Sequence, residues 1–441
     1  MALAGAAPRG EAAAARGAWL FALPSLLLLF GMVFLPTAYQ PWKAALVLLA
    51  VAVAVAARLR SPLRTLHRDT LLWTVVLLAL GLSFMARGLL RGEPGALRVG
   101  TVYALWPAAF AILIAGAGDA AVLRRHVTLF IAATFAVCVY GLEFVLEQGG
   151  WLPRSIFPDL FPDQGVGFYE GFVELRLPSL AVLPFGLPFL IAAGMCWGRG
   201  QGSPLRRRWV WAALLVGLLL AALSGRRAVL LVVGLAPPMT LLLLTLLPRA
   251  ERRELLWPAI LLIGALAFAV AVIGAFLGAF YGFDAGLLWE MFREGFDPRS
   301  SESSSIRAEQ LTELMSAWKA HPLLGAGHGG FLRSHVRDLA RPWSYELSYP
   351  ALLFQTGVLG FSLYAALFAW IFWQAARMIR AGGEAGLTML PVTVGLAAFL
   401  LANGTNPYLL KFDFMWAVFL PLALVNRWLV DRETAGSALQ G

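Results

Sequence analysis

Residues 209–247 read WVWAALLVGLLLAALSGRRAVLLVVGLAPPMTLLLLTLL, two apolar runs joined by the short polar segment Ser224-Gly225-Arg226-Arg227. A transmembrane helix needs about 20 predominantly apolar residues, and each run approaches that length. Similar runs recur from Trp19 to Val430, and the chain of 441 residues is 60% hydrophobic and only 14% charged. Because an ordinary soluble domain is about 25% charged, the sequence excludes a soluble enzyme and predicts a polytopic membrane protein.

The apolar runs predict one all-α integral membrane domain over residues 1–441, with about twelve transmembrane helices. The expected helices lie near residues 18–36, 43–57, 71–90, 99–116, 127–146, 179–197, 209–224, 228–247, 255–281, 349–375, 386–404 and 414–430. The two cysteines, Cys138 and Cys196, lie inside apolar runs. Their placement argues against a disulfide framework and against a cysteine-rich metal site.

The arginines indicate the orientation of these helices. If the amino terminus is cytoplasmic, every connection on the cytoplasmic side is basic, as in the Arg58–Arg68, Arg206–Arg208 and Arg249–Arg253 segments. This is the pattern that the positive-inside rule describes, so both termini are expected in the cytoplasm. The net charge of +10 then follows from membrane topology, which argues against nucleic acid as a partner.

Two connections are too long to be simple turns, and both fall on the extracytoplasmic side of this topology. The first covers residues 147–178, and the second, larger one covers residues 281–348. Long loops on a rigid scaffold often carry function. We therefore expect the functional site in the larger loop, which is predicted to contain a helix, and at the helix ends that face it.

Arg226 and Arg227 stand at the outer end of two apolar runs, where the positive-inside rule gives no reason for a cation. Two guanidinium groups at the amino-terminal end of a helix would form an anion site, because free backbone N–H groups, the helix dipole and the arginine donors all favour phosphate. The alternative is that both side chains reach the lipid headgroups of the outer leaflet.

Arg307 opens an expected amphipathic helix that runs from about Ser303 to Lys319. Leu311, Leu314, Met315 and Trp318 follow helical spacing, and Arg307 heads the same stripe. A cation on the apolar face near a helix start is unfavourable on its own, so we expect an anionic partner. This partner is either a phosphate group or an acid of the chain, such as Glu302 or Glu309.

Residues 321–331 read HPLLGAGHGGF and contain a formal G-x-G-x-x-G pattern, but no strand precedes it and a dinucleotide site is not predicted. The glycine-rich turn is expected to present N–H groups to a phosphate. His321 and His328 are candidate anion donors, and His328 is also a candidate proton acceptor, although a lone histidine is more often structural. The spacing of His321, His328 and His335 does not favour a zinc site.

Glu346 lies in the segment Trp343–Tyr349, at the mouth of the next apolar run. Partial desolvation beside aromatic rings would suit its carboxylate to act as a general base. The alternative is a structural salt bridge to Arg341 or Arg337.

Taken in order, these motifs resemble the O-antigen ligase/polymerase superfamily. The resemblance covers roughly residues 209–362 and includes Tyr345-Glu346-Leu347-Ser348-Tyr349 ahead of Leu353–Gly360. It implies a C-type glycosyltransferase-like fold that uses a polyprenyl-diphosphate-linked glycan as donor, with no cofactor and no metal. It also implies that Arg226 or Arg227 and Arg307 hold the diphosphate and that the His321–His328 loop lies beside it. Ligases of this family usually carry a histidine just before the helix that follows the loop, where this chain has Glu346, so a polymerase is favoured.

The expected function is therefore metal-independent, inverting transfer of the glycan to a sugar hydroxyl at the periplasmic face of a bacterial inner membrane. Arginines would stabilise the departing diphosphate, a task that cytoplasmic transferases often give to a divalent ion. The acceptor is another glycan for a polymerase and lipid A-core for a ligase. A transporter or flippase also fits about twelve helices, and so does a structural or assembly protein of the membrane.

Overall fold

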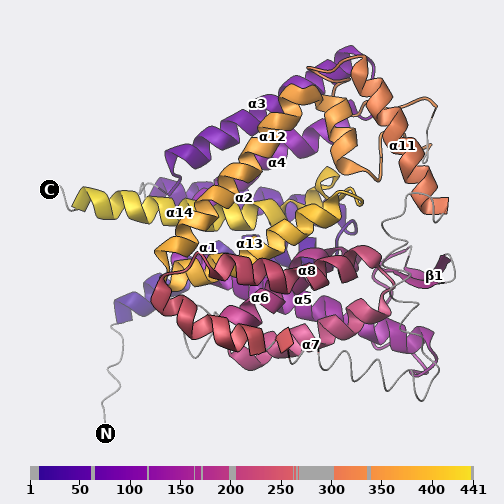
Figure 1. Cartoon of the computed structure of the whole chain (residues 1–441). Helices are drawn as coiled ribbons and strands as arrows, with labels where there is room; N and C mark the ends of the chain where they lie inside the picture. The colour runs from indigo at the N-terminus through magenta and orange to yellow at the C-terminus, as the bar shows by residue number, and fades with distance from the viewer. Residues whose placement is uncertain are drawn as a thin grey trace, which may run out of the picture.

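The protein is a helical bundle, described by a computed structural model that covers residues 9–60, 65–116, 119–162, 164–169, 172–197, 205–261, 263, 264, 267, 302–334 and 339–438. Figure 1 shows the beginning of α1 and the end of α14 at one end of the bundle, with α11 and the β1 strand at the opposite end. The larger helices are α1 (Arg9–Phe34), α2 (Gln40–Arg60), α3 (Arg68–Leu90), α4 (Ala96–Gly116), α5 (Ala120–Gln148), α6 (Leu183–Cys196), α7 (Arg207–Leu223), α8 (Arg227–Leu244), α11 (Glu302–Lys319), α12 (Ser348–Ala381), α13 (Gly383–Asn403) and α14 (Trp416–Ala438).

Seven stretches within the described residues are helical, long and apolar enough to cross a membrane. They are α3, α4, α5, Pro178–Cys196, α8, α12 and α13, and shorter apolar stretches cover Ala22–Phe34 and Gln40–Ala56. The expected all-α, multi-pass architecture is thus supported at this coarser level, and the number twelve stays a prediction. The span expected near 255–281 lies mostly outside the described residues.

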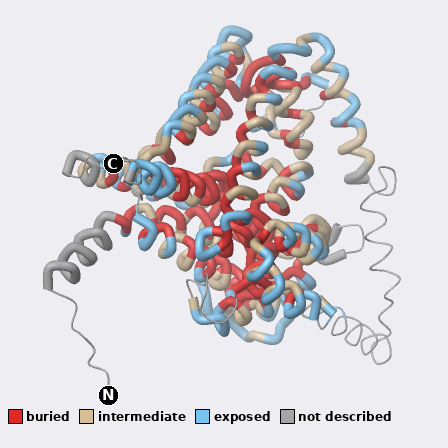
Figure 2. The backbone as a smooth tube through the Cα atoms, turned by 60° about the vertical axis from the view of Figure 1, so that its left-hand side comes forward, coloured by how far each residue is buried: buried red, intermediate tan, exposed pale blue. Residues whose placement is uncertain are grey.

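The α6 helix forms the centre of the bundle, and all of its residues are buried. It contacts α13 and α8 most extensively, with α7 on a further side. Figure 2 shows this buried interior in red, with exposed residues mostly at the periphery. Because α6 carries no charged or strongly polar side chain, it can be enclosed completely without leaving an unsatisfied polar group.

The first long connection, expected only as a loop, contains a two-stranded antiparallel hairpin formed by β1 (Gly165–Tyr169) and β2 (Phe172–Arg176). A short 3₁₀ helix, Pro178–Val182, then leads into α6. The Leu175 N–H donates a hydrogen bond to the Ser224 carbonyl oxygen at 3.1 Å. This contact places the hairpin on the turn between α7 and α8, where the sequence has its Ser-Gly-Arg-Arg segment.

The α12 helix is broken at Gly357, although the sequence predicts one continuous run over 349–375. Gly357 has φ 63° and ψ −175°, a conformation that essentially only glycine adopts. Backbone polar groups released inside a transmembrane helix must find partners within the protein. They find them in the glycine-rich loop between α11 and α12, as described below.

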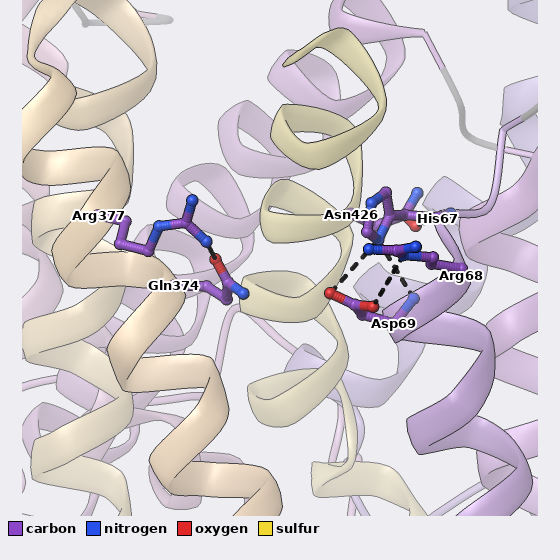
Figure 3. Close-up of polar contacts among 6 residues, drawn as sticks. All are labelled: His67, Arg68, Asp69, Gln374, Arg377 and Asn426. Carbon is purple, nitrogen blue, oxygen red and sulfur yellow. Dashed lines mark hydrogen bonds and ion pairs between the residues drawn. The ribbon is translucent and has the colours of Figure 1, made fainter. Parts of the chain in front are cut away.

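At the end of the bundle where α14 ends, side chains link α3 to α14, and Figure 3 shows them together with Arg377 and Gln374 of α12. The Asn426 carboxamide joins α14 to the start of α3, because it accepts from the His67 N–H at 2.9 Å and donates to the Thr65 carbonyl at 2.7 Å. The His67 imidazole in turn caps α3 by accepting from the Asp69 N–H. On α12, the Arg377 guanidinium donates to Gln374.

Candidate functional site

The centre of the candidate site is an ion pair between Arg307 on α11 and Glu346 in the segment that leads into α12. The Arg307 Nε lies 2.8 Å from the Glu346 Oε2, and the two side chains are 37% and 25% exposed. Arg307 therefore has an anionic partner, as expected, and this partner is Glu346; the side chain of Glu302, one of the acids expected, lies outside the described part of the chain. Glu346 forms a salt bridge with Arg307, an arginine that was not among its expected partners; Arg337 lies outside the described residues, so pairing with it stays a prediction.

The α11 helix is confirmed, with bounds close to those expected, but its buried face differs from the predicted stripe. Leu311 is 42% exposed, whereas Gln310 and Leu314 are buried. Leu314 packs with Tyr345, Ala326 and Leu332 in a small apolar cluster at this end of the bundle. The predicted stripe left out Gln310 because its side chain is polar. In the structure Gln310 is buried, and its Oε1 accepts a hydrogen bond from the Leu347 N–H at 3.1 Å.

This packing holds Glu346 firmly in place. Its neighbour Tyr345 is 1% exposed, and the Tyr345 hydroxyl accepts a hydrogen bond from the Leu332 N–H at 2.6 Å. Leu347, on the other side, is bonded to Gln310. The carboxylate is thus presented by a backbone fixed on both sides, which is the preorganisation that a catalytic group needs.

Arg226 lies at the amino-terminal end of α8 as its N-cap residue, and Arg227 is the first residue of that helix. Gly225 has φ +66°, so the turn depends on a glycine. The buried Ser224 hydroxyl accepts from the Arg226 N–H at 3.3 Å and donates to the Ala221 carbonyl at 2.8 Å. The Ser-Gly-Arg-Arg sequence therefore forms a tight turn that exposes the start of α8 towards the hairpin.

Some of the hydrogen-bond donors of the Arg226 guanidinium are used within the protein. Its Nη2 donates to the carbonyl oxygens of Leu175 at 3.1 Å and Leu177 at 3.3 Å. The side chain also lies close to the Tyr408 hydroxyl. Its Nε is buried and, within the described part of the chain, has no hydrogen-bond partner. Arg226 therefore both anchors the strand end and keeps one buried donor available.

One segment, residues 404–411, connects the surroundings of Arg226 with those of Glu346. The Ser348 N–H, two residues after Glu346, donates to the Gly404 carbonyl at 3.3 Å. Tyr408 contacts Arg226. The sequence-separated candidates Arg226 and Arg307 thus flank the same segment. At its end, Lys411 lies within range of the charges of Arg98, Arg341 and Asp413, so three cations and one carboxylate meet in this region.

The glycine-rich loop does not present its N–H groups to a phosphate, contrary to the sequence-based expectation. The N–H groups of Gly325, Ala326, Gly327, His328 and Gly330 all donate to carbonyl oxygens of the protein. Ala326 and Gly327 bond the Phe354 and Gln355 carbonyls at 2.9 and 2.8 Å, and the N–H groups of Val358 and Leu359 bond back to Pro322 and Leu323 at 2.9 and 3.1 Å. The loop thereby replaces the helical hydrogen bonds that α12 loses at Gly357.

His328 lies at the inner side of this loop and is completely buried. Its ring stacks on Tyr103 with 4.8 Å between centroids, and its Nε2 is 3.4 Å from the Tyr364 hydroxyl. Burial lowers the pKa of His328 to about 4, so the ring is neutral at pH 7. In this enclosed position His328 supports the loop between α3, α4 and α12.

His321 lies on the exposed side of the same loop, where its Nε2 is 3.0 Å from the Arg91 Nη2. Arg87, one turn earlier on α3, donates from its Nε to the Gly325 carbonyl at 2.8 Å. Sequence reasoning did not select either arginine. The available signal was the one that selected Arg226, since the predicted topology places both at the extracytoplasmic end of an apolar run, where the positive-inside rule requires no cation.

An apolar groove opens next to this polar region. Its enclosed volume is about 70 Å³, and apolar side chains of α3, α4, α12 and α14 form its walls, including Leu77, Val102, Leu352, Phe368 and Val418. Ser348, Tyr349 and Asn403 provide polar groups at one end, and Ser348 is two residues from Glu346. Ser348 is thus the residue through which the groove approaches the segment that carries Glu346.

Among the described residues, no group of three or more His, Cys, Asp or Glu side chains is arranged to hold a metal ion. Comparison of the chain with models of known protein families and with curated proteins gives no match.

Proposed function

We propose that this protein is a membrane glycosyltransferase that moves a polyprenyl-diphosphate-linked glycan onto a sugar hydroxyl at the periplasmic face of a bacterial inner membrane. The observation that carries the proposal is the Arg307–Glu346 ion pair, which stands two residues along the chain from Ser348, a residue that lines an apolar groove. A cation, a carboxylate and an apolar channel are the groups that a lipid-linked diphosphate sugar and its acceptor would need.

The ion pair suggests how the substrate activates the site. When the donor diphosphate binds, Arg307 turns part of its hydrogen bonding to the phosphate oxygens, since guanidinium binds phosphate and carboxylate with the same donor fork. Glu346 can then accept a hydrogen bond from the acceptor hydroxyl. The pair therefore holds the carboxylate in position until the donor arrives.

The transfer is a single displacement at the anomeric carbon. The acceptor hydroxyl gives its proton to the Glu346 carboxylate, and its oxygen forms a bond to the anomeric carbon. The bond from that carbon to the diphosphate oxygen breaks, and the diphosphate leaves with the electron pair and inverts the configuration. Arg307 and the buried Nε–H of Arg226 stabilise the charge that develops on the leaving group.

His328 has a positioning role in this proposal, because its ring is enclosed and fixes the loop that completes α12. The exposed pair of His321 and Arg91 lies on the exposed side of the same loop, and we assign it to the surface that binds the donor diphosphate. Arg227, at the start of α8, belongs to the same surface through the helix dipole.

A transporter or flippase is the second candidate, and the broken α12 helix favours it. Transporters commonly place discontinuous helices at their binding sites. In this chain the backbone groups at the break are satisfied by the glycine loop, which leaves few of them for a substrate. The catalytic proposal is therefore preferred, and the two functions differ in whether covalent transfer takes place.

The test uses purified protein in liposomes with a polyprenyl-diphosphate-linked repeat unit and EDTA, with and without lipid A-core, and product size is read on a gel. A ladder from the donor alone is the expected result and indicates a polymerase, whereas a product formed only with lipid A-core indicates a ligase. Arg307→Ala should abolish transfer while the protein remains folded. Near-wild-type turnover of this variant would contradict the assignment, as would movement of the lipid across the bilayer without transfer.

A further inference from the structure

Two tryptophans and two arginines alternate across α12 and α14, at the end of the bundle where α14 ends. The Arg377 guanidinium carbon of α12 lies 5.0 Å from the ring centroid of Trp373 on its own helix and 5.5 Å from that of Trp428 on α14. The Arg432 guanidinium carbon, one turn further along α14, lies 4.8 Å from the centroid of the same Trp428 ring. The two guanidinium carbons are therefore no more than about 10 Å apart, the sum of their distances to that ring. These four side chains form what we call the Trp–Arg cluster.

The Trp–Arg cluster brings two positive charges together without an acid between them. In the described part of the chain, neither Arg377 nor Arg432 forms an ion pair. Asp431 and Glu433 flank Arg432 in sequence, but successive residues of a helix do not face each other, and the Asp431 carboxylate accepts from the Arg427 Nε at 2.9 Å. Like charges at this separation repel each other, so an anion that contacts both arginines would be bound favourably.

The aromatic contacts leave N–H donors of both guanidinium groups open. An arginine has five N–H donors in one plane, and an aromatic ring contacts the face of that plane. The Arg377 Nη1 donates to the Oε1 of the buried Gln374 at 3.1 Å (Figure 3). The other two side-chain nitrogens of Arg377 have no hydrogen-bond partner among the described residues and are not buried, and Arg432 is exposed. The cluster therefore holds a positioned set of charged donors, which suits the oxygens of a phosphate group.

The place of the cluster along its helices indicates the source of the phosphate. Arg377 lies four residues before the end of α12 at Ala381, which is about 6 Å along the helix axis, and α12 is long and apolar enough to cross a membrane. Trp373, one turn further into the helix, is 55% exposed, as is typical of an indole at a membrane–water interface. A phosphate at this depth belongs to a lipid headgroup, whose acyl chains can lie on the surface of α12 beside Trp373.

We propose that the Trp–Arg cluster is a binding site for an anionic phospholipid. Arg377 and Arg432 donate to the phosphate oxygens of one headgroup, and the exposed Trp373 indole packs beside the upper part of its acyl chains. A zwitterionic lipid also carries a phosphate, but its ammonium group cancels the charge that attracts both arginines. Basic sites between helices at the cytoplasmic side commonly bind anionic headgroups, and the predicted orientation places this end of the bundle in the cytoplasm. The site does not depend on the glycan transfer proposed for the outer face.

Native mass spectrometry of the purified full-length protein tests the proposal with phosphatidylglycerol and phosphatidylcholine that have identical acyl chains. Phosphatidylglycerol should bind about tenfold more tightly, the factor expected for one charge-assisted hydrogen bond. Equal binding of the two lipids would overturn the proposal. Glycerophosphoglycerol, the same headgroup without acyl chains, should not displace the lipid at equal concentration. Displacement would assign the site to a soluble phosphate and would overturn the lipid assignment.

Three variants locate the site. Arg377→Gln and Arg432→Gln each remove one of the two cations, so each should weaken binding of phosphatidylglycerol about tenfold and leave phosphatidylcholine unchanged. Arg432 is exposed, so its variant keeps the test valid if Arg377→Gln does not fold. Arg68→Gln is the matched control, because Arg68 lies at the same end of the bundle (Figure 3), is 87% exposed and is not part of the cluster. Unchanged binding in Arg432→Gln would overturn the assignment, and so would an equal loss in Arg68→Gln, which would indicate attraction to the general surface charge.

Discussion

Substitution of Gly357 by alanine tests how the break in α12 is maintained. A Cβ atom at this position would lie 2.3 Å from the carbonyl carbon and oxygen of Leu323, and backbone atoms cannot move aside as a flexible side chain can. The conformation of Gly357 alone would cost an alanine about 1–3 kcal/mol. The clash would also disturb the four backbone hydrogen bonds between the loop and α12, each worth about 1 kcal/mol. We therefore expect a loss of about 5 kcal/mol of stability.

A matched control separates the two contributions. Gly92 also has a positive φ, of 70°, but a Cβ there meets nothing within 4 Å, so Gly92→Ala should cost about 1–2 kcal/mol. Thermal unfolding of the purified variants in detergent, together with limited proteolysis between α11 and α12, compares them. Equal unfolding temperatures for Gly357→Ala and Gly92→Ala would refute the idea that the glycine loop and the broken helix depend on each other.

Three further predictions concern single side chains. Lys43 and Asp413 form an ion pair and are 2% and 1% exposed. Lys43→Met should therefore destabilise the protein by about 3–5 kcal/mol, and addition of Asp413→Leu should restore much of the loss. A double variant that melts at no higher temperature than Lys43→Met would argue against this. Burial lowers the pKa of His328 to about 4 in the folded protein, so the unfolded chain binds the proton more readily. The contribution of His328 to the free energy of unfolding should be fully present above about pH 6.5 and fall by about 3 kcal/mol as the pH drops to 4. His328→Gln should flatten this pH dependence of the melting temperature. Arg226→Lys cannot reproduce both bonds, to the Leu175 carbonyl in β2 and the Leu177 carbonyl just after it, so protease should cut the β1–β2 region faster than in the wild type. An unchanged cleavage rate would show that Arg226 does not anchor it.

The fold class could be predicted from sequence because apolar runs report directly on membrane-spanning helices. The hairpin of β1 and β2 could not, since its stability comes from contacts with the turn at Ser224, which is distant in sequence. The break at Gly357 was equally hidden, because glycines are common in transmembrane helices and only the nearby loop shows why this one interrupts the helix.

For the candidate site, sequence reasoning selected residues that do lie at the same end of the bundle. It identified Arg307 as needing an acid but could not select Glu346, because pairing across 39 residues depends on how α11 packs. It assigned phosphate-binding N–H groups to the glycine loop, which the structure uses for α12. The general reason is that a sequence shows which groups are unusual in their local context, but not which distant partner satisfies them.

The most direct test of the proposed transferase is the rate of glycan transfer by the Glu346→Gln variant in liposomes, measured beside Glu309→Gln. Both substitutions remove one carboxylate from the same end of the molecule, but Glu309 is exposed on α11 and is given no role in the reaction. If Glu346 is the general base, its variant should be slower by about 10²–10⁴-fold and Glu309→Gln should be unaffected. Wild-type rates for Glu346→Gln, with the donor shown to be bound, would contradict the account.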